Sequence, residues 1–251
     1  MSLRFPTADP QSRGPLLEAG QIHLWVARLD PPEFRVAELR RLLDPEEQTR
    51  ADRYRFDVHR RRFIVGRGFQ RVVLGAYLGL APERIRYDFG PKGKPALADG
   101  SGRGGLQFNL SNSEELALLG ITRNQELGVD VEHLRPLSDL EALAERFFSR
   151  RESEVLLALP PALRVRGFFN CWTRKEAYLK AVGEGITAPL DRFDVTLAPG
   201  EPARMLALEG SVERAASWNL YHLEPAVEFL GAVAIEGAHW RLECWSWRPE
   251  G

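Results

Sequence analysis

Two carboxylates lie two residues apart in the apolar segment Gly128-Val129-Asp130-Val131-Glu132. In a strand, the period of two places both acids on one face and both valines on the other, with the acids about 7 Å apart. Two anions at this spacing beside an apolar sheet repel each other unless a cation or water intervenes, and hard oxygen ligands suit Mg2+. The pair indicates a metal site, although a solvated strand face is the simpler reading of this pattern by itself.

A second group of reactive side chains has helical spacing. Trp172, Glu176 and Lys180 recur at i, i+4 and i+8, which places them on one face of a helix. The plain alternative is a Glu-to-Lys surface salt bridge worth a few tenths of a kcal/mol. The chain has only four lysines, and Lys175 and Lys180 are both in this helix. The glycines of Gly183-Glu184-Gly185 then permit a backbone turn that approaches a ligand closely. We therefore favour a role in chemistry.

Further segments offer contacts for phosphate oxygens. Gly93-Lys94-Pro95 places a cation at the tip of a Gly/Pro loop, and Asn109-Leu110-Ser111 places an amide and a hydroxyl at a strand end. Each segment by itself is more often a turn. Together with Arg62 and Arg67 they would supply the positive wall that a polyphosphate needs.

Other familiar site patterns are absent or incomplete in the sequence. Gly100 to Gly105 satisfies G-x-G-x-x-G but neither follows a clear strand nor opens a helix. None of the five histidines has a partner at metal-ligand spacing. No nucleophile motif such as G-x-S-x-G occurs, so an attacking hydroxyl would belong to the substrate.

Composition restricts the class of protein. The 251 residues carry 34 basic and 35 acidic side chains, so no global field favours a nucleic acid or a membrane as partner. The two cysteines are too few for a disulfide framework, and no apolar segment is long enough to span a bilayer. We expect a cytoplasmic protein with no membrane and no nucleic-acid partner.

The pattern along the chain predicts an α/β (α+β) protein of two similar halves. We expect a loose N-terminal arm over 1–20, an N-terminal half over 21–125 that supplies phosphate contacts, and a C-terminal half over 126–251 that supplies the metal site and catalytic helix. The order strand, helix, helix, strands occurs twice, with about 104 residues between the two long helical segments.

Local signals predict the individual elements. Strands are expected at 22–30, 106–112, 115–124 and 127–134, followed by strands with turns over 193–247. Asp44-Pro45 predicts a helix start, 50–80 is helical with Gly79 as its stop, and further helices are expected at 139–159 and 164–185. Residues 90–105 are too rich in Gly and Pro for regular structure.

In the order GKPAL, FNLSNS, GVDVE and FFNCWTRKEAYLKAVGEGI, these segments resemble the Sfp-type 4'-phosphopantetheinyl transferases. The fixed positions of the family pattern G-[VI]-D-[VIL]-E and W-[ST]-x-K-E-A-x-x-K-x-x-G-x-G are all met. The resemblance runs roughly from Arg50 to Glu236. It implies a monomer whose two halves have a pseudo-twofold arrangement, with the active site, coenzyme A as co-substrate and Mg2+, or alternatively Mn2+, in the cleft between them.

The resemblance also implies roles. Asp130, Glu132 and Glu176 would hold or face the metal. Glu176 or Glu132, directly or through water, would deprotonate a serine of an acyl or peptidyl carrier protein, which attacks the phosphate bearing the pantetheine arm. Lys180 would stabilise or protonate the departing 3',5'-ADP. The residues expected to contact the phosphates of coenzyme A are Lys94, Asn109, Ser111, Asn112, Arg62, Arg67, Lys175 and Lys180.

One position departs from the family pattern. Asn112 stands where the family usually has His after N-[LIV]-S, so a possible cation becomes a neutral amide. We expect weaker coenzyme A binding as a result.

Three alternative functions compete with this interpretation. A Mg2+-dependent nuclease also uses Asp-x-Glu with a later Glu and Lys, although those two usually lie two apart on a strand. An RNA-binding module could use the basic segment Arg60 to Arg71, but no aromatic platform accompanies it. A non-catalytic relative that only docks carrier proteins is disfavoured because every presumed ligand is present.

Overall fold

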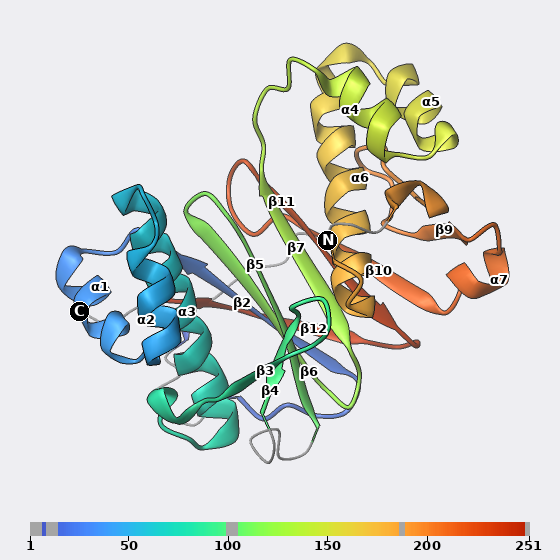
Figure 1. Ribbon diagram of the computed structural model, residues 1–251. Coiled ribbons are helices and arrows are strands. Elements are labelled where there is room, and N and C mark those ends of the chain that lie inside the picture. The colour runs from blue at the N-terminus through green and yellow to red at the C-terminus, as the bar shows by residue number, and fades with distance from the viewer. Residues whose placement is uncertain (1–6, 9–14, 99–104, 186–188, 249–251) are drawn as a thin grey trace. The chain divides into compact units, whose positions relative to one another are not determined.

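The computed structural model describes residues 7–8, 15–98, 105–185 and 189–248 (Figure 1). The chain forms two compact units. The N-terminal unit contains the described residues up to 89, then 95–98, 105–124 and 241–248, and the C-terminal unit contains 90–94, 125–185 and 189–240. No described helix is both long and apolar enough to cross a membrane.

The N-terminal unit is built on a five-stranded sheet with the order β1-β12-β2-β6-β5. The strands are β1 (Thr7–Ala8), β2 (Gln21–Arg28), β5 (Leu106–Ser113), β6 (Leu116–Arg123) and β12 (Arg241–Trp247). β12 runs parallel to β1 and β2, whereas the β2–β6 and β5–β6 pairs are antiparallel. β5 and β6 form a hairpin, in which Asn112 pairs with Ala117 and Ser113 with Leu116.

Helices pack against this sheet and form the first core. They are α1 (Glu33–Arg41), α2 (Pro45–Asp52), α3 (Asp57–Leu78) and the short 3-10 helix η1 (Pro82–Arg84), followed by the two-stranded pair β3 (Tyr87–Phe89) and β4 (Pro95–Leu97). Phe69 and Val73 of α3 pack with Trp25 of β2 in this core. α3 ends where Gly79 adopts a left-handed backbone, a conformation that glycine tolerates without strain.

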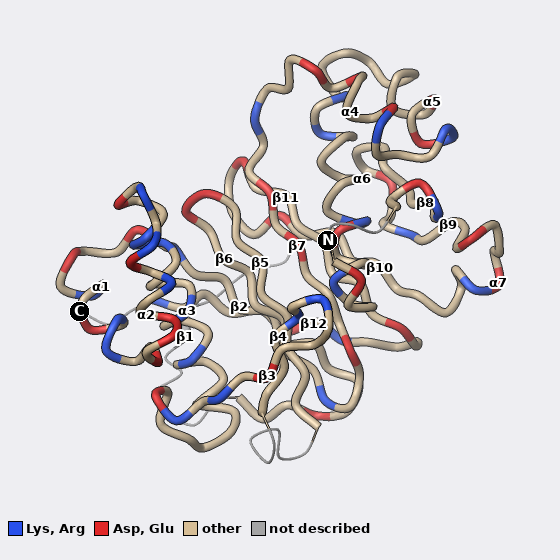
Figure 2. Tube along the Cα trace, viewed as in Figure 1, with Lys and Arg blue, Asp and Glu red and all other residues tan. Residues whose placement is uncertain are grey.

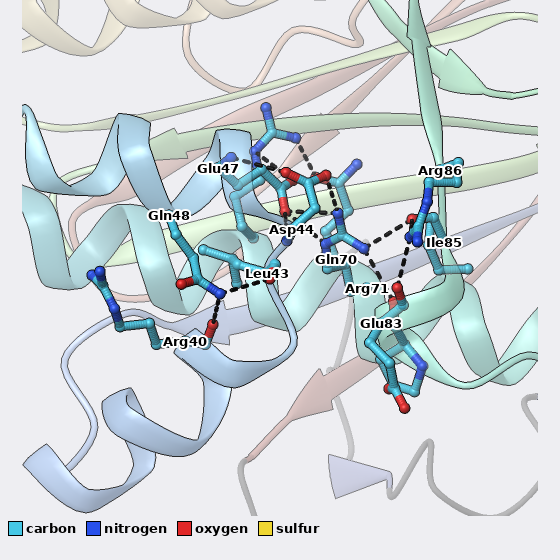
Figure 3. Close-up of polar contacts among 12 residues, drawn as sticks. Arg40, Leu43, Asp44, Glu47, Gln48, Gln70, Arg71, Glu83, Ile85 and Arg86 are labelled. Carbon is cyan, nitrogen blue, oxygen red and sulfur yellow. Dashed lines mark hydrogen bonds and ion pairs between the residues drawn. The ribbon is translucent and has the colours of Figure 1, made fainter.

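A buried arginine fixes α2 against α3 (Figure 3). Asp44 and Glu47 form the capping box of α2, and both carboxylates also bind the guanidinium of Arg71 on α3, at 2.7 Å in each case. The same guanidinium donates to the backbone oxygens of Pro82 and Ile85, at 3.2 and 2.9 Å. Since the Arg71 side chain is fully buried, its pairing is needed to offset desolvation, and it determines where α2 lies.

The C-terminal unit places a long helix against a three-stranded antiparallel sheet with the order β10-β11-β7. The strands are β7 (Leu127–His133), β10 (Trp218–Leu223) and β11 (Phe229–Glu236), and the remaining elements are α4 (Leu140–Phe147), α5 (Arg150–Ala158), α6 (Pro161–Val182), η2 (Leu190–Arg192), β8 (Phe193–Val195), β9 (Met205–Leu208) and α7 (Val212–Ala215). Ala177 and Leu179 of α6 contribute to the second core, together with Ala232 of β11. Both units therefore carry one 22-residue helix on an antiparallel pair of strands, as the repeated pattern predicts.

Several predicted boundaries differ from the structure. The helical segment 50–80 is interrupted at 53–56, so α2 and α3 are separate, and 139–159 divides where Ser149 begins a new capping box. Residues 95–97 form a strand despite their Pro, because they pair along one edge only, with β3.

Two domain boundaries also differ. Residues 241–247 were assigned to the C-terminal half but form β12, which pairs with β2 in the N-terminal unit. In the predicted loose arm, residues 7–8 pair with β12 and Leu17 is buried in the core, whereas 1–6 and 9–14 lie outside the described residues, as do 99–104.

Candidate active site

The predicted carboxylates lie where α6 packs against β7. Strand alternation places Gly128, Asp130 and Glu132 on one face of β7, as predicted. A Cβ atom at Gly128 would lie 1.9 Å from the backbone oxygen of Ala177 and 2.4 Å from the backbone nitrogen of Ala181. Only a residue without a side chain permits this approach, which brings the backbone of α6 directly onto β7 beside the acids.

The close approach brings the acids of the strand and the charged residues of the helix together. Lys180 Nζ lies 2.6 Å from Asp130 Oδ1, so the lysine pairs with the strand rather than with Glu176 one turn before it. Asp130 and Glu176 are both buried, at 3% and 6% exposure. Burial, followed by the charge of Asp130, raises the pKa of Glu176, while Lys180 opposes the rise. Four residues predicted from two separate motifs thus form one charged cluster in the C-terminal unit: Asp130, Glu132, Glu176 and Lys180.

The donor chemistry of this cluster suits a hard cation. Glu176 Oε1 is buried and has no hydrogen-bond partner among the described residues, and carboxylate neighbours raise the pKa of its group. In the described part of the chain, no three Asp, Glu, His or Cys side chains are already arranged around a common metal position. The oxygen donors therefore fit Mg2+ in type, and their side chains have to rotate to close a coordination shell.

Glu132 has a cationic neighbour of its own. Arg135 Nη1 lies 3.7 Å from Glu132 Oε2 and donates to the backbone oxygen of His133 at 3.3 Å. The guanidinium carbon of Arg135 also lies over the ring of Phe169 on α6, 5.4 Å from the ring centre. No sequence motif marks Arg135.

Lys175 does not have the predicted phosphate contact. Its side chain is fully buried, and its ammonium pairs with Glu152 Oε2 at 2.8 Å and donates to the backbone oxygens of Leu190, at 2.6 Å, and Phe193. Three donors thus meet three acceptors, which leaves none for a ligand. The sequence prediction is corrected: Lys175 holds α5, α6 and the start of β8 together, because Glu152 also accepts from the backbone nitrogen of Val195.

Lys94 lies at the C-terminal end of α6. Its Nζ pairs with Glu126 Oε2 at 2.5 Å and donates to the backbone oxygen of Ala181 at 3.1 Å. The Ala181 oxygen is in the last turn of α6, where backbone carbonyl groups have no partner within the helix. Two of the three donors of Lys94 are therefore already engaged within the C-terminal unit.

A basic cavity of about 350 Å3 lies in the N-terminal unit. Arg62, Arg67 and Asn112, three of the predicted phosphate ligands, line it. Its other lining residues are Arg50, Tyr54, His59, Phe63, Gly66, Pro95, Leu110 and Glu114. A second cavity of about 660 Å3 shares Arg50, Phe63 and Arg67 with the first. Three residues of the predicted phosphate wall thus lie together, at a place formed by α2, α3, β4 and β5.

Two predicted phosphate ligands do not reach this cavity. In β5, Phe108 packs in the core and Leu110 and Asn112 line the cavity, so the even-numbered side chains face α3. Asn109 and Ser111 alternate with them and lie on the other face of the strand, where both are buried. The predicted set is therefore divided between two faces of one strand.

The basic segment of α3 is largely neutralised by carboxylates. Arg60 pairs with Asp57, Arg61 with Glu33, Arg62 with Asp30 and Glu114, and Arg71 with Asp44 and Glu47. Figure 2 shows acidic residues interspersed with basic ones around α1 to α3. This pairing removes the unbalanced basic stripe on which the RNA-binding alternative depended.

Sequence reasoning missed four residues that line the first cavity: Arg50, Tyr54, His59 and Glu114. Arg50 has no carboxylate partner in the described part of the chain and lies over the ring of Phe63, with its guanidinium carbon 5.2 Å from the ring centre. No local motif marks it. Its place depends on the anchoring of α2 by Arg71, which joins residues far apart in the sequence.

Comparison with known proteins matches both parts of the chain to one family. Residues 126–233 match the 4'-phosphopantetheinyl transferase superfamily, and residues 29–123 match the N-terminal region of 4'-phosphopantetheinyl transferases.

Individual relatives agree with the family match. The chain is 43% identical over 229 residues to the 4'-phosphopantetheinyl transferase HetI of Nostoc sp., covering 91% of this chain and 93% of the relative. It is 34% identical over 172 residues to a putative 4'-phosphopantetheinyl transferase of Synechocystis sp., covering 68% and 69%. It is 31% identical over 155 residues to the 4'-phosphopantetheinyl transferase Sfp of Bacillus subtilis, covering 62% and 66%.

Proposed function

The chain belongs to the 4'-phosphopantetheinyl transferase superfamily and is an enzyme of that class, and we propose that it transfers the 4'-phosphopantetheine group of coenzyme A to a serine of an acyl or peptidyl carrier protein. The other product is 3',5'-ADP. The observation that carries this proposal is the cluster of Asp130, Glu176 and Lys180, since its geometry supplies a proton acceptor and a fixed cation side by side.

The proton acceptor in this proposal is Glu176. A general base works best when its pKa lies near the working pH, and burial raises the pKa of this carboxyl from that of an exposed glutamate. Its Oε1 has no hydrogen-bond partner among the described residues, so it is available to accept the serine proton. The serine oxygen then forms a bond to the phosphorus that bears the pantetheine arm, and the bond from that phosphorus to the 3',5'-ADP oxygen breaks.

Lys180 supports departure of the leaving group. Its ammonium is held 2.6 Å from Asp130 Oδ1, and its side chain is partly exposed. A positive charge fixed in advance stabilises the charge that develops on the leaving phosphate without reorganising during the reaction. Asp130 therefore positions Lys180 for this role.

Asp130, Glu132 and Glu176 would hold Mg2+, which when bound would neutralise charge on the diphosphate of coenzyme A. Their own contribution is a set of hard oxygen donors within one cluster, in which Asp130 and Glu176 are buried. Metal dependence is tested by adding excess chelator to the assay, which should stop transfer, and by restoring it with Mg2+ and separately with Mn2+.

The nucleotide end of coenzyme A is assigned to the basic cavity of the N-terminal unit. Arg50 and Arg67 line both adjoining cavities there, and the rings of Tyr54 and Phe63 offer apolar surface beside them. Guanidinium groups bind phosphate oxygens through paired hydrogen bonds, so this surface suits a phosphorylated nucleoside. Arg50 is the arginine most available for this contact, because no carboxylate in the described part of the chain pairs with it.

The direct test mixes the protein with apo carrier proteins, coenzyme A and Mg2+, and then measures intact carrier masses. We expect the mass of one phosphopantetheine group to be added to the carrier serine by the wild type and not by Glu176→Gln. Glu154→Gln is the matched control, because Glu154 is exposed on α5 and, among the residues that the structure describes, pairs only with Arg150 four residues before it. The proposal fails if the wild type modifies none of several carriers from fatty acid, polyketide and nonribosomal peptide synthesis. If Glu176→Gln retains turnover, another group is the base.

A further inference from the structure

An acidic residue lines the basic cavity of the N-terminal unit. Glu114 lies in the turn between β5 and β6, with φ at 46°, a left-handed conformation unusual for a residue with a side chain. Its Oε2 is 2.7 Å from Arg62 Nη1, and about half of its side chain is exposed. It lines the same cavity as Arg50, Arg67 and Asn112.

Arg62 is bound by two carboxylates that hold it differently. Asp30 binds through both oxygens, with Oδ1 3.2 Å from Nε and Oδ2 3.1 Å from Nη2, a bidentate contact that fixes the guanidinium plane. Glu114 contacts the guanidinium at Nη1 through one oxygen. The contact with Glu114 can therefore be exchanged for another anion while Asp30 keeps Arg62 in place.

We propose that Glu114 is a built-in competitor for the phosphate of the incoming coenzyme, and that it sets the affinity of this cavity by occupying Arg62 in the free enzyme. The inference rests on the proposed function, since the competing phosphate belongs to coenzyme A. A phosphate that enters the cavity takes the Nη1 donor from Glu114, and the displaced carboxylate turns toward solvent, which its exposure permits.

A neighbouring residue at the same cavity strengthens the effect. Asn112 and Glu114 are two residues apart and both line the cavity, so a neutral amide and an anion stand together at its wall. The cavity consequently carries less net positive charge than its arginines suggest. Coenzyme affinity is thereby lowered and made less dependent on ionic strength than in a cavity without Glu114.

The test compares Glu114→Gln with Glu115→Gln, its neighbour in the same turn. Glu115 is the matched control because its Oε1 pairs with Arg28 at 2.9 Å and it does not line the cavity. We expect Glu114→Gln to lower the Michaelis constant for coenzyme A about three- to fivefold at low ionic strength, with kcat unchanged, because it removes one exposed charge pair. The difference should shrink at about 1 M salt, where screening acts within a few ångströms. Glu115→Gln should match the wild type.

Isothermal titration of the wild type and both variants with coenzyme A separates the two proposals. If the wild type binds coenzyme A and modifies carriers but Glu114→Gln has an unchanged or higher Michaelis constant, the role of Glu114 is wrong and the proposed function stands. If the wild type neither binds coenzyme A nor modifies any carrier, the proposed function is wrong and the inference falls with it.

Discussion

Replacing Gly128 with alanine tests whether the close approach of α6 to β7 sets the geometry of the carboxylate cluster. The added methyl carbon would lie 1.9 Å from the backbone oxygen of Ala177, whereas ordinary contact begins at 3.4 Å. The obstructing atoms belong to the backbone of α6, so no side-chain rotation relieves the overlap. Helix and strand must separate by roughly 1.5 Å.

The effect on the cluster follows from that separation. If it were transmitted in full, the 2.6 Å contact between Lys180 Nζ and Asp130 Oδ1 would open to about 4 Å, beyond hydrogen-bond distance. Misplacement of reacting groups by about 1 Å can cost roughly a hundredfold in rate. Overpacking of this kind typically also costs about 1–3 kcal/mol of the free energy of unfolding. We therefore expect kcat for carrier modification to fall about a hundredfold in a variant that remains folded.

A glycine of α6 itself provides the control for lost stability. A Cβ atom at Gly167 would lie 2.6 Å from Leu159 Cδ1 and 3.0 Å from Leu156 Cδ1, so it meets only the ends of flexible side chains. Gly167→Ala should lower the melting temperature but keep nearly all of kcat. Both variants are compared by thermal unfolding and by the rate of carrier modification at a temperature where both are folded.

Two results would refute this reasoning. The first is a Gly128→Ala enzyme that turns over at the wild-type rate, which would mean that the separation is absorbed without disturbing the cluster. The second is an equal loss of kcat in both variants, which would attribute the effect to stability alone.

The other predictions concern single charges. Burial raises the pKa of Glu176 above its unfolded value, so ionisation opposes folding as pH rises through that range; Glu176→Gln should therefore raise the melting temperature near neutral pH but not at about pH 3, and equal melting curves at both pH values would contradict this. Lys175→Met should lower the free energy of unfolding by about 3–5 kcal/mol because it leaves Glu152 buried without its partner, while coenzyme A affinity of the folded fraction stays the same; weakened binding with normal stability would restore the phosphate role. Asn112→His should lower the Michaelis constant for coenzyme A by up to about tenfold below pH 6.5, and the decrease should be larger when the change is combined with Glu114→Gln. An unchanged or higher Michaelis constant would show that a histidine at this position does not strengthen coenzyme A binding in this protein.

The central cluster could be predicted from the sequence because its two parts each follow a local rule. Strand alternation determines that Asp130 and Glu132 share a face, and helical spacing determines that Glu176 and Lys180 share another. Their meeting was not a local property. That the two pairs share one site was inferred from the resemblance to a family. The physical reason is Gly128, which permits α6 to pack closely against β7.

The phosphate ligands were harder to predict because an arginine or lysine in the sequence does not show which acid pairs with it. Lys175 was expected at the coenzyme and is instead bound by Glu152, 23 positions earlier on α5. Arg62 was expected to contact phosphate and lines a cavity, but its pairing with Asp30 and Glu114 depends on contacts between α3, the end of β2 and the β5–β6 turn.

The sequence by itself determined the family, the two-part α/β organisation and the side chains of the charged cluster, because these depend on residue types at short, regular spacings. The tertiary structure decided which charges are available. In the folded chain Lys175 is buried, and Asn109 and Ser111 lie on the opposite face of β5 from Asn112. Residues 241–247 form β12 in the sheet of the N-terminal unit. Each of these outcomes depends on contacts between distant segments, whose free energies of burial and pairing no local pattern contains.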